Sequence, residues 1–294
     1  MPSKTRVLLS DPRAIPFLFK KIAKFFIDKA QWIEVKFLTA FGVIDFKVPP
    51  NSSMRESSST NIRHYYESGL TTTLPIVTAA YIEGLDLRQP AEVLDFGCGV
   101  GRQLLQLARR YPKLNLHACD VNGRSIAYLK RAYPKIDSYA NEFSPPLKFS
   151  DSKFDLILSV SIFSHLSIKD NPIWLKELAR VTRPGGLCCL TILGSHAMGL
   201  HALASSGPFA SDQRKQLEEQ GFLFQNYERP DFQRAAAELW DKGNTLQLIK
   251  EEYGNTYLSE RFIRENWDNG DFELRQFIPG IIDQQQDLVV LKRR

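Results

Sequence analysis

The sequence predicts a doubly wound α/β fold around a mainly parallel sheet. Short apolar segments with the composition of buried strands occur at 93–96, 115–120, 154–160 and 187–193. Segments that suit helices separate them, at 102–110, 125–132 and 172–181. Apolar strands that alternate with helices are typical of a parallel sheet whose two faces are both covered.

The last two strand-like segments, 272–278 and 287–292, are predicted to form a closing pair. Pro279-Gly280 and a short loop connect them. A parallel pair would need a crossover of a dozen or more residues, so these two strands are expected to be antiparallel.

The N-terminal part, residues 1–73, is expected to form a helical extension or lid on a main domain of residues 74–294. Segment 17–38 places apolar residues between lysines at helical spacing, and polar stretches follow it at 49–53 and 57–61. Two roles stay open for this basic amphipathic segment. It contacts a membrane surface, or it covers the mouth of the site or a subunit interface.

The stretch 197–266 is more polar than the strands before it and is expected to form a helical insertion that acts as a lid. Gly207-Pro208 is predicted to break it, and 221–224 is a candidate short strand. Such a lid would select the substrate of the main domain.

Composition limits the classes of function. The chain has 294 residues, 43% of them hydrophobic, and a formal charge of +5 that is spread along the sequence, so nucleic acid is not indicated as a partner. Its four cysteines form no CxxC pair and no apolar run approaches a membrane span, so we expect a cytoplasmic protein. The five histidines are scattered, and we expect no metal site.

A glycine-rich stretch, DFGCGVG, follows the first predicted strand at residues 95–101. The first strand-to-helix turn of an open parallel sheet approaches a ligand at the carboxyl edge. Gly97, Gly99 and Gly101 would let that turn bend sharply and contact the ligand with no Cβ between them. The dinucleotide motif GxGxxG is not matched, because Arg102 stands where its last glycine would be, and a P-loop ending is absent.

Two acidic residues suggest what the loop binds. Asp95 would repel a pyrophosphate but suits a ligand that carries an ammonium group. Asp120 ends the next predicted strand, where a carboxylate accepts hydrogen bonds from both hydroxyls of a ribose; capping the following helix is its other possible role. An ammonium at the loop and a ribose at the second strand describe S-adenosylmethionine.

At these residues the sequence resembles the class I S-adenosylmethionine-dependent methyltransferases. The similarity covers roughly 74–292 and is carried by segments 92–102, 117–122, 141–147, 154–161 and 178–186. The resemblance implies a Rossmann-like methyltransferase fold with a seven-stranded sheet and an antiparallel last strand. It also implies S-adenosylmethionine as the cofactor and transfer of its methyl group as the activity.

The resemblance further implies which residues bind the cofactor. The glycines would line its methionine part with Asp95 near the ammonium, Asp120 would hold the ribose, and Val121 would pack on the adenine. The remaining cofactor-binding candidates are Arg102, Asn141, Glu142, Ser159 and Ser161. Arg102 would meet the methionine carboxylate or would be a solvated surface charge.

The acceptor side is less defined by the sequence. His165 follows the fourth predicted strand and could take a proton from a hydroxyl acceptor as a general base, or it could pack against the next helix. Weaker acceptor-side candidates are His196, Tyr65, Tyr66 and Tyr253. We expect O-methylation of a small molecule or saccharide; the alternative is a non-catalytic binding or scaffold protein with this fold. The sequence leaves the oligomeric state open.

Overall fold

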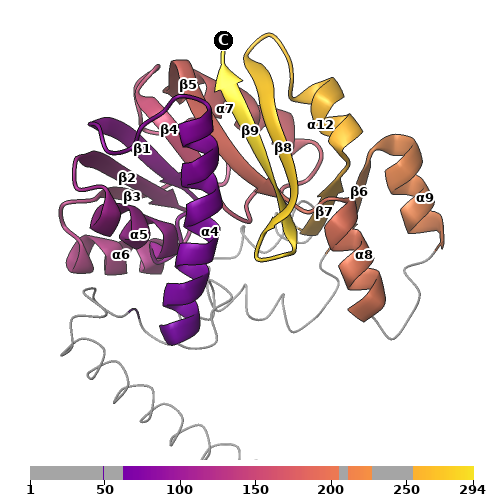
Figure 1. Cartoon of the computed structure of the whole chain (residues 1–294), viewed down its shortest axis with the longest axis horizontal. Helices are drawn as coiled ribbons and strands as arrows, with labels where there is room; N and C mark the ends of the chain where they lie inside the picture. The colour runs from indigo at the N-terminus through magenta and orange to yellow at the C-terminus, as the bar shows by residue number, and fades with distance from the viewer. Residues whose placement is uncertain (1–48, 50–61, 205–210, 227–253) are drawn as a thin grey trace, which may run out of the picture.

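The computed structural model describes residue 49 and residues 62–204, 211–226 and 254–294. Its centre is a seven-stranded sheet with the strand order β3-β2-β1-β4-β5-β9-β8 (Figure 1). The strands are β1 (Ala91–Phe96), β2 (Leu114–Asp120), β3 (Asp137–Ala140), β4 (Phe154–Ser159), β5 (Thr182–Ile192), β8 (Phe272–Ile282) and β9 (Gln286–Arg293). Neighbours among β1 to β5 pair in parallel, while β9 pairs antiparallel with both β5 and β8. The predicted fold class is confirmed.

Helices cover both faces of this sheet in the described part of the chain. They are α4 (Ile62–Ile82), α5 (Arg102–Arg110), α6 (Gly123–Ala132), α7 (Asp170–Val181), α8 (Ser195–Ala204), α9 (Ser211–Gln220) and α12 (Glu260–Asn266). A second, two-stranded sheet pairs β6 (Phe222–Asn226) antiparallel with β7 (Gly254–Leu258). The predicted strand near 221–224 corresponds to β6.

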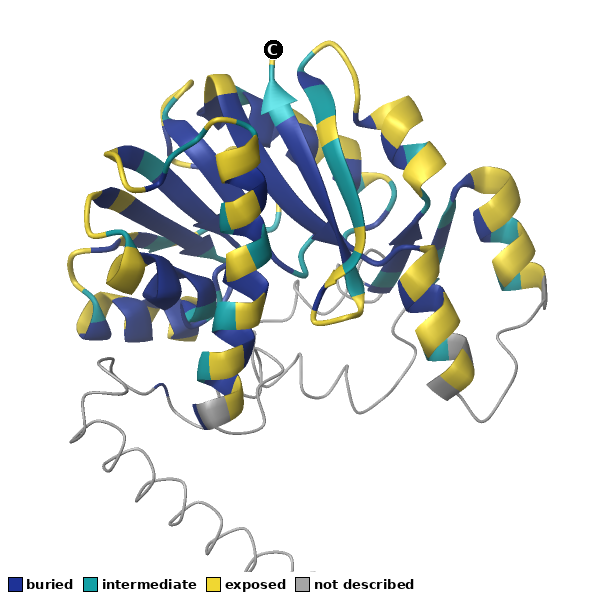
Figure 2. Cartoon of the chain, in the orientation of Figure 1, coloured by how far each residue is buried: buried dark blue, intermediate teal, exposed yellow. Residues whose placement is uncertain are grey.

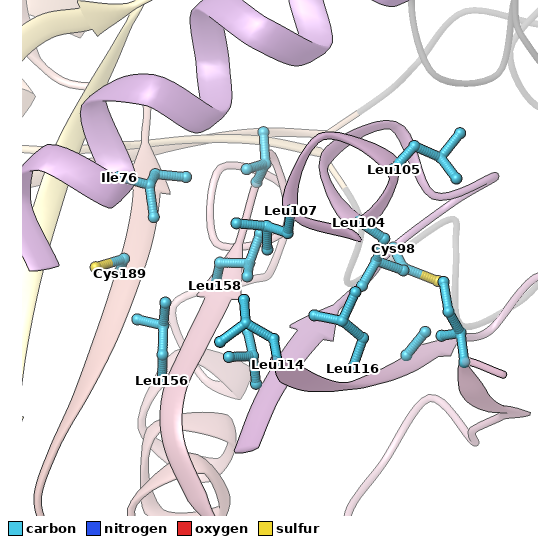
Figure 3. Close-up of a cluster of buried hydrophobic side chains, with 14 of the residues drawn as sticks. Ile76, Cys98, Leu104, Leu105, Leu107, Leu114, Leu116, Leu156, Leu158 and Cys189 are labelled. Carbon is cyan, nitrogen blue, oxygen red and sulfur yellow. The ribbon is translucent and has the colours of Figure 1, made fainter. Parts of the chain in front are cut away.

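The core is divided between the two faces of the sheet because successive side chains of a strand point to opposite faces. On β4, Leu156 and Leu158 pack in the cluster with α4, α5 and α6, whereas Ile157 packs in the cluster with α7 and α12. Figure 3 shows Leu156 and Leu158 beside Leu107 and Leu114 in the first cluster. Figure 2 shows the central strands buried and the outer faces of the helices exposed.

The strand register places the carboxyl ends of the parallel strands and the β8–β9 turn at one edge of the sheet. Asp95 near the end of β1 is level with Ala118 of β2 and Leu158 of β4. Ile192 at the end of β5 is level with Asp287 of β9, so the β8–β9 turn lies at the same carboxyl edge. Ligands of open α/β sheets bind at this edge.

Helix α4 crosses the expected boundary between residues 73 and 74. It runs without interruption over 21 residues, and its first half packs on α5: Gly69 lies so close to the start of α5 that an added Cβ would stand 2.9 Å from the Arg102 carbonyl oxygen. Ile62 and Tyr65 are each only 1% exposed. The first turns of α4 therefore belong to the packed unit of the main domain.

Two other expectations differ in part from the structure. In its described part, the expected helical insertion 197–266 contains helices and the predicted strand β6, but also a second strand, β7, that was not predicted. Strand β8 continues through Pro279-Gly280 to Ile282, because the Gly280 N–H donates to the Asp287 carboxylate (2.8 Å) and the strand accommodates an irregularity there. The predicted segment 17–38 and the Gly207-Pro208 break lie outside the described residues.

Candidate cofactor and active site

The glycine loop joins β1 to α5 at the carboxyl edge of the sheet. Gly97, Gly99 and Gly101 all have positive φ angles, of 78°, 52° and 81°, which side-chain-bearing residues adopt only with strain. The Gly97 and Cys98 N–H groups both donate to the Cys119 carbonyl oxygen, at 2.9 and 3.1 Å. These bonds fix the loop against the end of β2.

The three glycines serve different purposes. A Cβ on Gly97 would overlap the side chain of Ile162, and one on Gly101 would lie 2.7 Å from Leu129 Cδ2. Among the described residues, no atom would lie within 4 Å of a Cβ on Gly99. Gly97 and Gly101 thus permit close packing behind the loop, while no described side chain blocks the approach of a ligand to the Gly99 backbone.

Asp120 ties the loop to the next helix. One carboxylate oxygen accepts the Gly99 N–H (2.7 Å) and the other accepts the Asn122 N–H (2.7 Å). Asn122 is itself the N-cap of α6, and its side chain accepts from Arg124 N and Ser125 N. The helix cap is therefore Asn122, and Asp120 orders both loops; each of its oxygens keeps a second lone pair for a ligand hydroxyl.

Asp95 is a buried carboxylate directly beneath the loop. Its side chain is 1% exposed, and its Oδ2 has no hydrogen-bond partner among the described residues. Burial, reinforced by the negative charge of Asp120 and opposed by Arg102, raises the pKa of Asp95 to about 8. Such a group gains most from a ligand that brings a positive charge.

Arg102 begins α5 and is half-buried, not a freely solvated charge. Its Nη1 donates to the Ser68 hydroxyl of α4 (3.1 Å), and its Nε has no partner in the described part of the chain. Burial lowers the pKa of the guanidinium, and nearby Asp283, Tyr65 and Asp95 oppose that effect. A buried donor without a partner suits a ligand carboxylate.

The candidates for the adenine side lie at the ends of β2 and β3. The Asn141 N–H donates to the Asp120 carbonyl oxygen (3.1 Å), and its side-chain Nδ2 donates to the Glu142 carbonyl oxygen (2.7 Å). The buried Asn141 Oδ1 has no partner among the described residues. Val121 is half-buried and Glu142 is exposed, so of these side chains Asn141 and Val121 present the more enclosed surfaces.

The end of β4 carries the remaining candidates. Ser159 is fully buried and its hydroxyl has no partner in the described residues, while Ser161, two residues on, has a φ of 62°. His165 follows in the same loop, with its Nδ1 2.9 Å from the Gly254 carbonyl oxygen. Burial lowers the pKa of His165, and the bond to Gly254 partly offsets this.

The loop with His165 is held by β7. The Thr256 N–H donates to the Ser164 carbonyl oxygen (2.8 Å), and the Thr256 hydroxyl donates to the Leu166 carbonyl oxygen (2.5 Å). The Gly254 N–H donates to the His165 carbonyl oxygen (3.2 Å). His165 therefore has a fixed position at the edge of the sheet, set by a strand 90 residues further along the chain.

The weaker acceptor-side candidates have different environments. His196 is exposed, with its Nε2 3.1 Å from the Gln284 carbonyl oxygen, and lines a cavity of about 450 Å³ beside the β8–β9 turn. The cavity is also lined by Leu200, Pro279, Gly280, Asp283, Gln284 and Gln285. Tyr65 is buried and donates to the Val100 carbonyl oxygen (3.0 Å), so it supports the glycine loop and is not part of a lid. Tyr66 is half-buried on α4, and Tyr253 lies outside the described residues.

Within the described ranges, no group of three or more histidine, cysteine or acidic side chains is placed to hold a metal ion. In the same part of the chain, none of the helices has the length and apolar character that crossing a membrane requires.

Several contacts that support the site could not be identified from the sequence. Tyr65, suggested only as a weak acceptor-side candidate, and Gly69 contact the glycine loop and α5 from the part of α4 that precedes the predicted domain. Thr191 and Gln286 contact Ser161 from β5 and β9. None of these residues belongs to a recognisable motif, and only the fold brings them to the site.

The strand order and the glycine loop together are those of a Rossmann-like α/β domain. Residues 93–186 match a family model described as a methyltransferase domain. The matched part includes most of β1, the glycine loop, Asp120 and the end of β4, where the predicted site residues lie.

Individual relatives are similar to part of the chain. The chain is 31% identical over 137 residues to a malonyl-[acyl-carrier protein] O-methyltransferase of Halorhodospira halophila, covering 43% of this chain and 42% of that enzyme. It is 30% identical over 126 residues to a trans-aconitate 2-methyltransferase of Deinococcus radiodurans, covering 40% of this chain and 44% of that enzyme. The alignments thus span less than half of either relative.

Among solved structures, the PH0226 protein of Pyrococcus horikoshii has the same fold. The TM-score is 0.50 at 14% sequence identity, and the alignment covers 78% of this chain and 91% of the other. At this identity the similarity supports the fold alone.

Proposed function

We propose that this chain transfers a methyl group from S-adenosylmethionine to an oxygen atom of a small molecule or saccharide. The observation that carries the proposal is a set of buried polar atoms without partners in the described chain: Asp95 Oδ2, Arg102 Nε and Asn141 Oδ1. In type, these atoms match the ammonium, the carboxylate and the adenine amine of the cofactor. Asp95 lies near the end of β1, Arg102 begins the helix that follows β1, and Asn141 directly follows β3, so all three lie toward the carboxyl edge of the sheet.

Different residues of the chain would bind different parts of the cofactor. Asp95 and Arg102 would hold the methionine end, Asp120 the ribose, and Val121 and Asn141 the adenine. When bound, S-adenosylmethionine supplies a methyl group on a positively charged sulfur, ready for in-line displacement by an acceptor atom. The remaining task of the protein is to orient the acceptor and to remove its proton.

His165 is the proposed general base. In the neutral ring, donation from Nδ1–H to the Gly254 carbonyl oxygen leaves Nε2 unprotonated. Burial lowers the pKa of His165, so this neutral form is dominant at neutral pH. A neutral imidazole of fixed orientation is the state that accepts a proton from a hydroxyl group.

The proposed acceptor is a small molecule, and the names of the two relatives guide the choice of compounds to test. One name specifies malonyl-[acyl-carrier protein] and the other specifies trans-aconitate. We therefore include carboxylic acids beside alcohols and saccharides in the class of acceptors to be tested.

Calorimetric titration with S-adenosylmethionine tests the cofactor. We expect binding by the wild type and a loss of affinity of about 10- to 100-fold in Asp95→Asn, since a hydrogen bond between charged groups contributes about 1.5–3 kcal/mol. Asp120→Ala should lose binding as well, but it also frees the Gly99 N–H, so Asp95→Asn isolates the ligand contact better. The matched control is Asp268→Asn, an exposed carboxylate paired with Arg294 far from the site.

Transfer of labelled methyl groups to panels of carboxylic acids, alcohols and saccharides tests the reaction. Methyl esters would be hydrolysed by alkali and methyl ethers would be stable to it. Alkali treatment of the labelled product therefore distinguishes the two classes. Cofactor binding without transfer to any acceptor would support the non-catalytic alternative. No binding by the wild type would refute the proposed function.

A further inference from the structure

Ser161 has a backbone conformation that its residue type disfavours. Its φ of 62° lies in the left-handed region, where glycine is the usual occupant. The turn it forms directly after β4 places Ile162 against Gly97, where an added Cβ would overlap the Ile162 side chain. The strained turn is therefore packed directly on the glycine loop.

A closed ring of three hydrogen bonds holds this turn. The Ser161 N–H donates to the Thr191 hydroxyl (2.8 Å), the Thr191 hydroxyl donates to Gln286 Oε1 (2.5 Å), and Gln286 Nε2 donates to the Ser161 hydroxyl (2.7 Å). Thr191 is the second-last residue of β5, and Gln286 is the first residue of β9. The ring thus joins three elements at the edge where the cofactor site lies.

The backbone donor determines the direction of every bond in the ring. Thr191 is fully buried, and because its oxygen accepts the Ser161 N–H, its own proton needs another acceptor. Only the carbonyl oxygen of the Gln286 amide can accept it, so the amide nitrogen must face Ser161. The reverse amide orientation would leave the buried Thr191 hydroxyl proton without an acceptor among the described residues.

It follows that the Ser161 hydroxyl acts as an acceptor toward Gln286. Its own proton is then directed away from the ring, and no described residue accepts it. Ser161 is half-buried beside the glycine loop, so the proton is presented at the ligand-facing edge of the sheet.

We propose that Thr191 and Gln286 are positioning residues for the cofactor: they hold the Ser161 turn against the glycine loop and orient the Ser161 hydroxyl as a donor to an oxygen of the bound cofactor. This inference rests on the proposed function. It assigns roles to two residues outside the glycine loop and outside every motif of the sequence, and it gives a reason for the strained serine. Glycine would fit the turn with less strain but would lack the donor.

Calorimetric titration with S-adenosylhomocysteine tests the inference without any methyl acceptor. Gln286→Ala opens the ring, and we expect about tenfold weaker binding. Gln286→Glu is isosteric and accepts from both hydroxyls, so the ring stays closed while the Ser161 proton is turned inward; we expect a loss of similar size. Thr191→Val should weaken binding about tenfold, whereas Thr191→Ser, which keeps the hydroxyl, should retain most of the affinity.

The double variant Gln286→Ala with Ser161→Gly separates the two roles. Glycine adopts the left-handed turn without the ring, so we expect about threefold tighter binding than in Gln286→Ala alone, with the donor still missing. Gln220→Ala, an exposed residue of the same type at the end of α9, is the control. Circular dichroism and thermal unfolding establish that each variant is folded.

The outcomes are distinguishable. Wild-type affinity in folded Gln286→Ala would overturn the holding role, and wild-type affinity in Gln286→Glu would overturn the donor role. Either result, with binding by the wild type intact, leaves the proposed function standing. A wild type that binds no S-adenosylhomocysteine overturns both the proposed function and this inference.

Discussion

Asp95 combines features that a purely structural carboxylate avoids. It is buried, one of its oxygens has no partner in the described chain, and a second carboxylate, Asp120, lies close enough to raise its pKa. An unpaired buried charge is costly, and the group responds by keeping its proton up to about pH 8. A bound cation would remove this energetic cost, as the proposed contact with an ammonium group requires.

This state predicts that cofactor binding releases a proton. The ammonium group binds the ionised carboxylate, whereas the free protein is mostly protonated at Asp95 below pH 8. The affinity for S-adenosylmethionine should therefore rise by about five- to tenfold per pH unit between pH 6 and 7.5, a range in which the α-amino group stays mostly charged. Titrations in buffers of different ionisation enthalpy would count the released proton.

Asp95→Asn provides the control for this pH dependence. The variant should bind more weakly and without the proton release assigned to Asp95. Because the folded-state pKa of Asp95 is raised, the wild type loses stability relative to the variant as pH rises from about 4 to 8. A wild-type affinity that is flat over this range would show that Asp95 does not meet the ammonium.

His165 gives a second prediction for a single residue. His165→Gln should lower turnover by about 10²–10⁴-fold, the range of general-base effects, while S-adenosylmethionine affinity stays near that of the wild type. His165→Asn is the matched variant, since its amide nitrogen can take the place of Nδ1 and donate to the Gly254 carbonyl oxygen. Both variants should lose turnover equally, as measured by labelled methyl transfer to the acceptor found in the screen.

Equal turnover in the wild type and both variants would remove His165 as the base. A deficit in His165→Gln alone would mean that the hydrogen bond to Gly254, and not proton transfer, is what the reaction needs. Because burial lowers the pKa of His165, wild-type turnover should remain constant down to pH values below 6.5 before protonation of the ring reduces it.

At the level of residues, the sequence predicts the site where local geometry demands particular residue types. Gly97 and Gly101 are required by positive φ angles and close packing, and such positions are visible as a glycine pattern. Gln286 and Thr191 contact each other from β9 and β5, although they lie 95 residues apart in the sequence. A glutamine at a strand start has many uses, so only the folded chain distinguishes this one.

Helix α4 supports the site as an element. Tyr65 bonds the Val100 carbonyl oxygen, Ser68 accepts from Arg102, and Thr71 and Thr72 donate to the Asp283 carboxylate at 3.0 and 3.4 Å. One helix therefore contacts the glycine loop, the start of α5 and the β8–β9 turn. Its position affects both the cofactor side and the edge that carries Gln286.

Gly69→Ala tests this role of the helix. The new Cβ would stand 2.9 Å from the Arg102 carbonyl oxygen and 3.0 Å from its Cγ, so α4 or α5 must shift. We expect the free energy of unfolding to fall by about 1–3 kcal/mol and the affinity for S-adenosylmethionine to weaken. Chemical denaturation and calorimetric titration measure the two effects.

Gly199→Ala is the matched control for that substitution. Gly199 also lies within a helix, α8, but an added Cβ there meets no atom of the described residues within 4 Å. Alanine should raise stability by about 0.5–1 kcal/mol through helix propensity and leave the affinity unchanged. If both alanine variants behaved alike, the close approach of α4 to α5 would have no energetic importance.

Elements could be predicted where hydrophobic pattern and length were unambiguous. The buried strands β1, β4 and β5 appear as apolar runs, and the end of β9 is equally clear. In contrast, β7 has the sequence GNTYL and β3 the sequence DSYA, which carry too few apolar residues to indicate strands. Their existence depends on partners in β6 and β2, which the local sequence does not specify.

For the whole molecule, the main question is where the folded unit begins. The resemblance to the family starts near residue 74, yet α4 starts at Ile62, and its first half supplies side chains to the same core as β1, β4 and β5. The sequence misses this because α4 has three consecutive threonines and an internal proline, Pro75, which weaken any helical pattern. Tertiary packing stabilises the helix despite this composition.

Two shortened chains would locate this start: one of residues 62–294 and one of residues 74–294. The shorter chain loses Ile62 and Tyr65, both 1% exposed, along with the buried hydroxyl groups of Thr72 and Thr73. Burial of each large side chain contributes about 1.5–3 kcal/mol, so we expect a difference of about 3–6 kcal/mol in the free energy of unfolding. For a domain of this size the melting temperature should fall by about 10 °C or more.

The shorter chain should also lose hydrogen-exchange protection in the rest of α4 and in the glycine loop, since the Tyr65 bond to Val100 and the Ser68 contact with Arg102 are gone. At a temperature where both chains are fully folded, the shorter chain should still bind S-adenosylmethionine more weakly than the longer one. Equal melting temperatures and equal affinities in the two chains would place the start of the functional domain at residue 74. The predicted difference would instead make the first three turns of α4 part of the cofactor site.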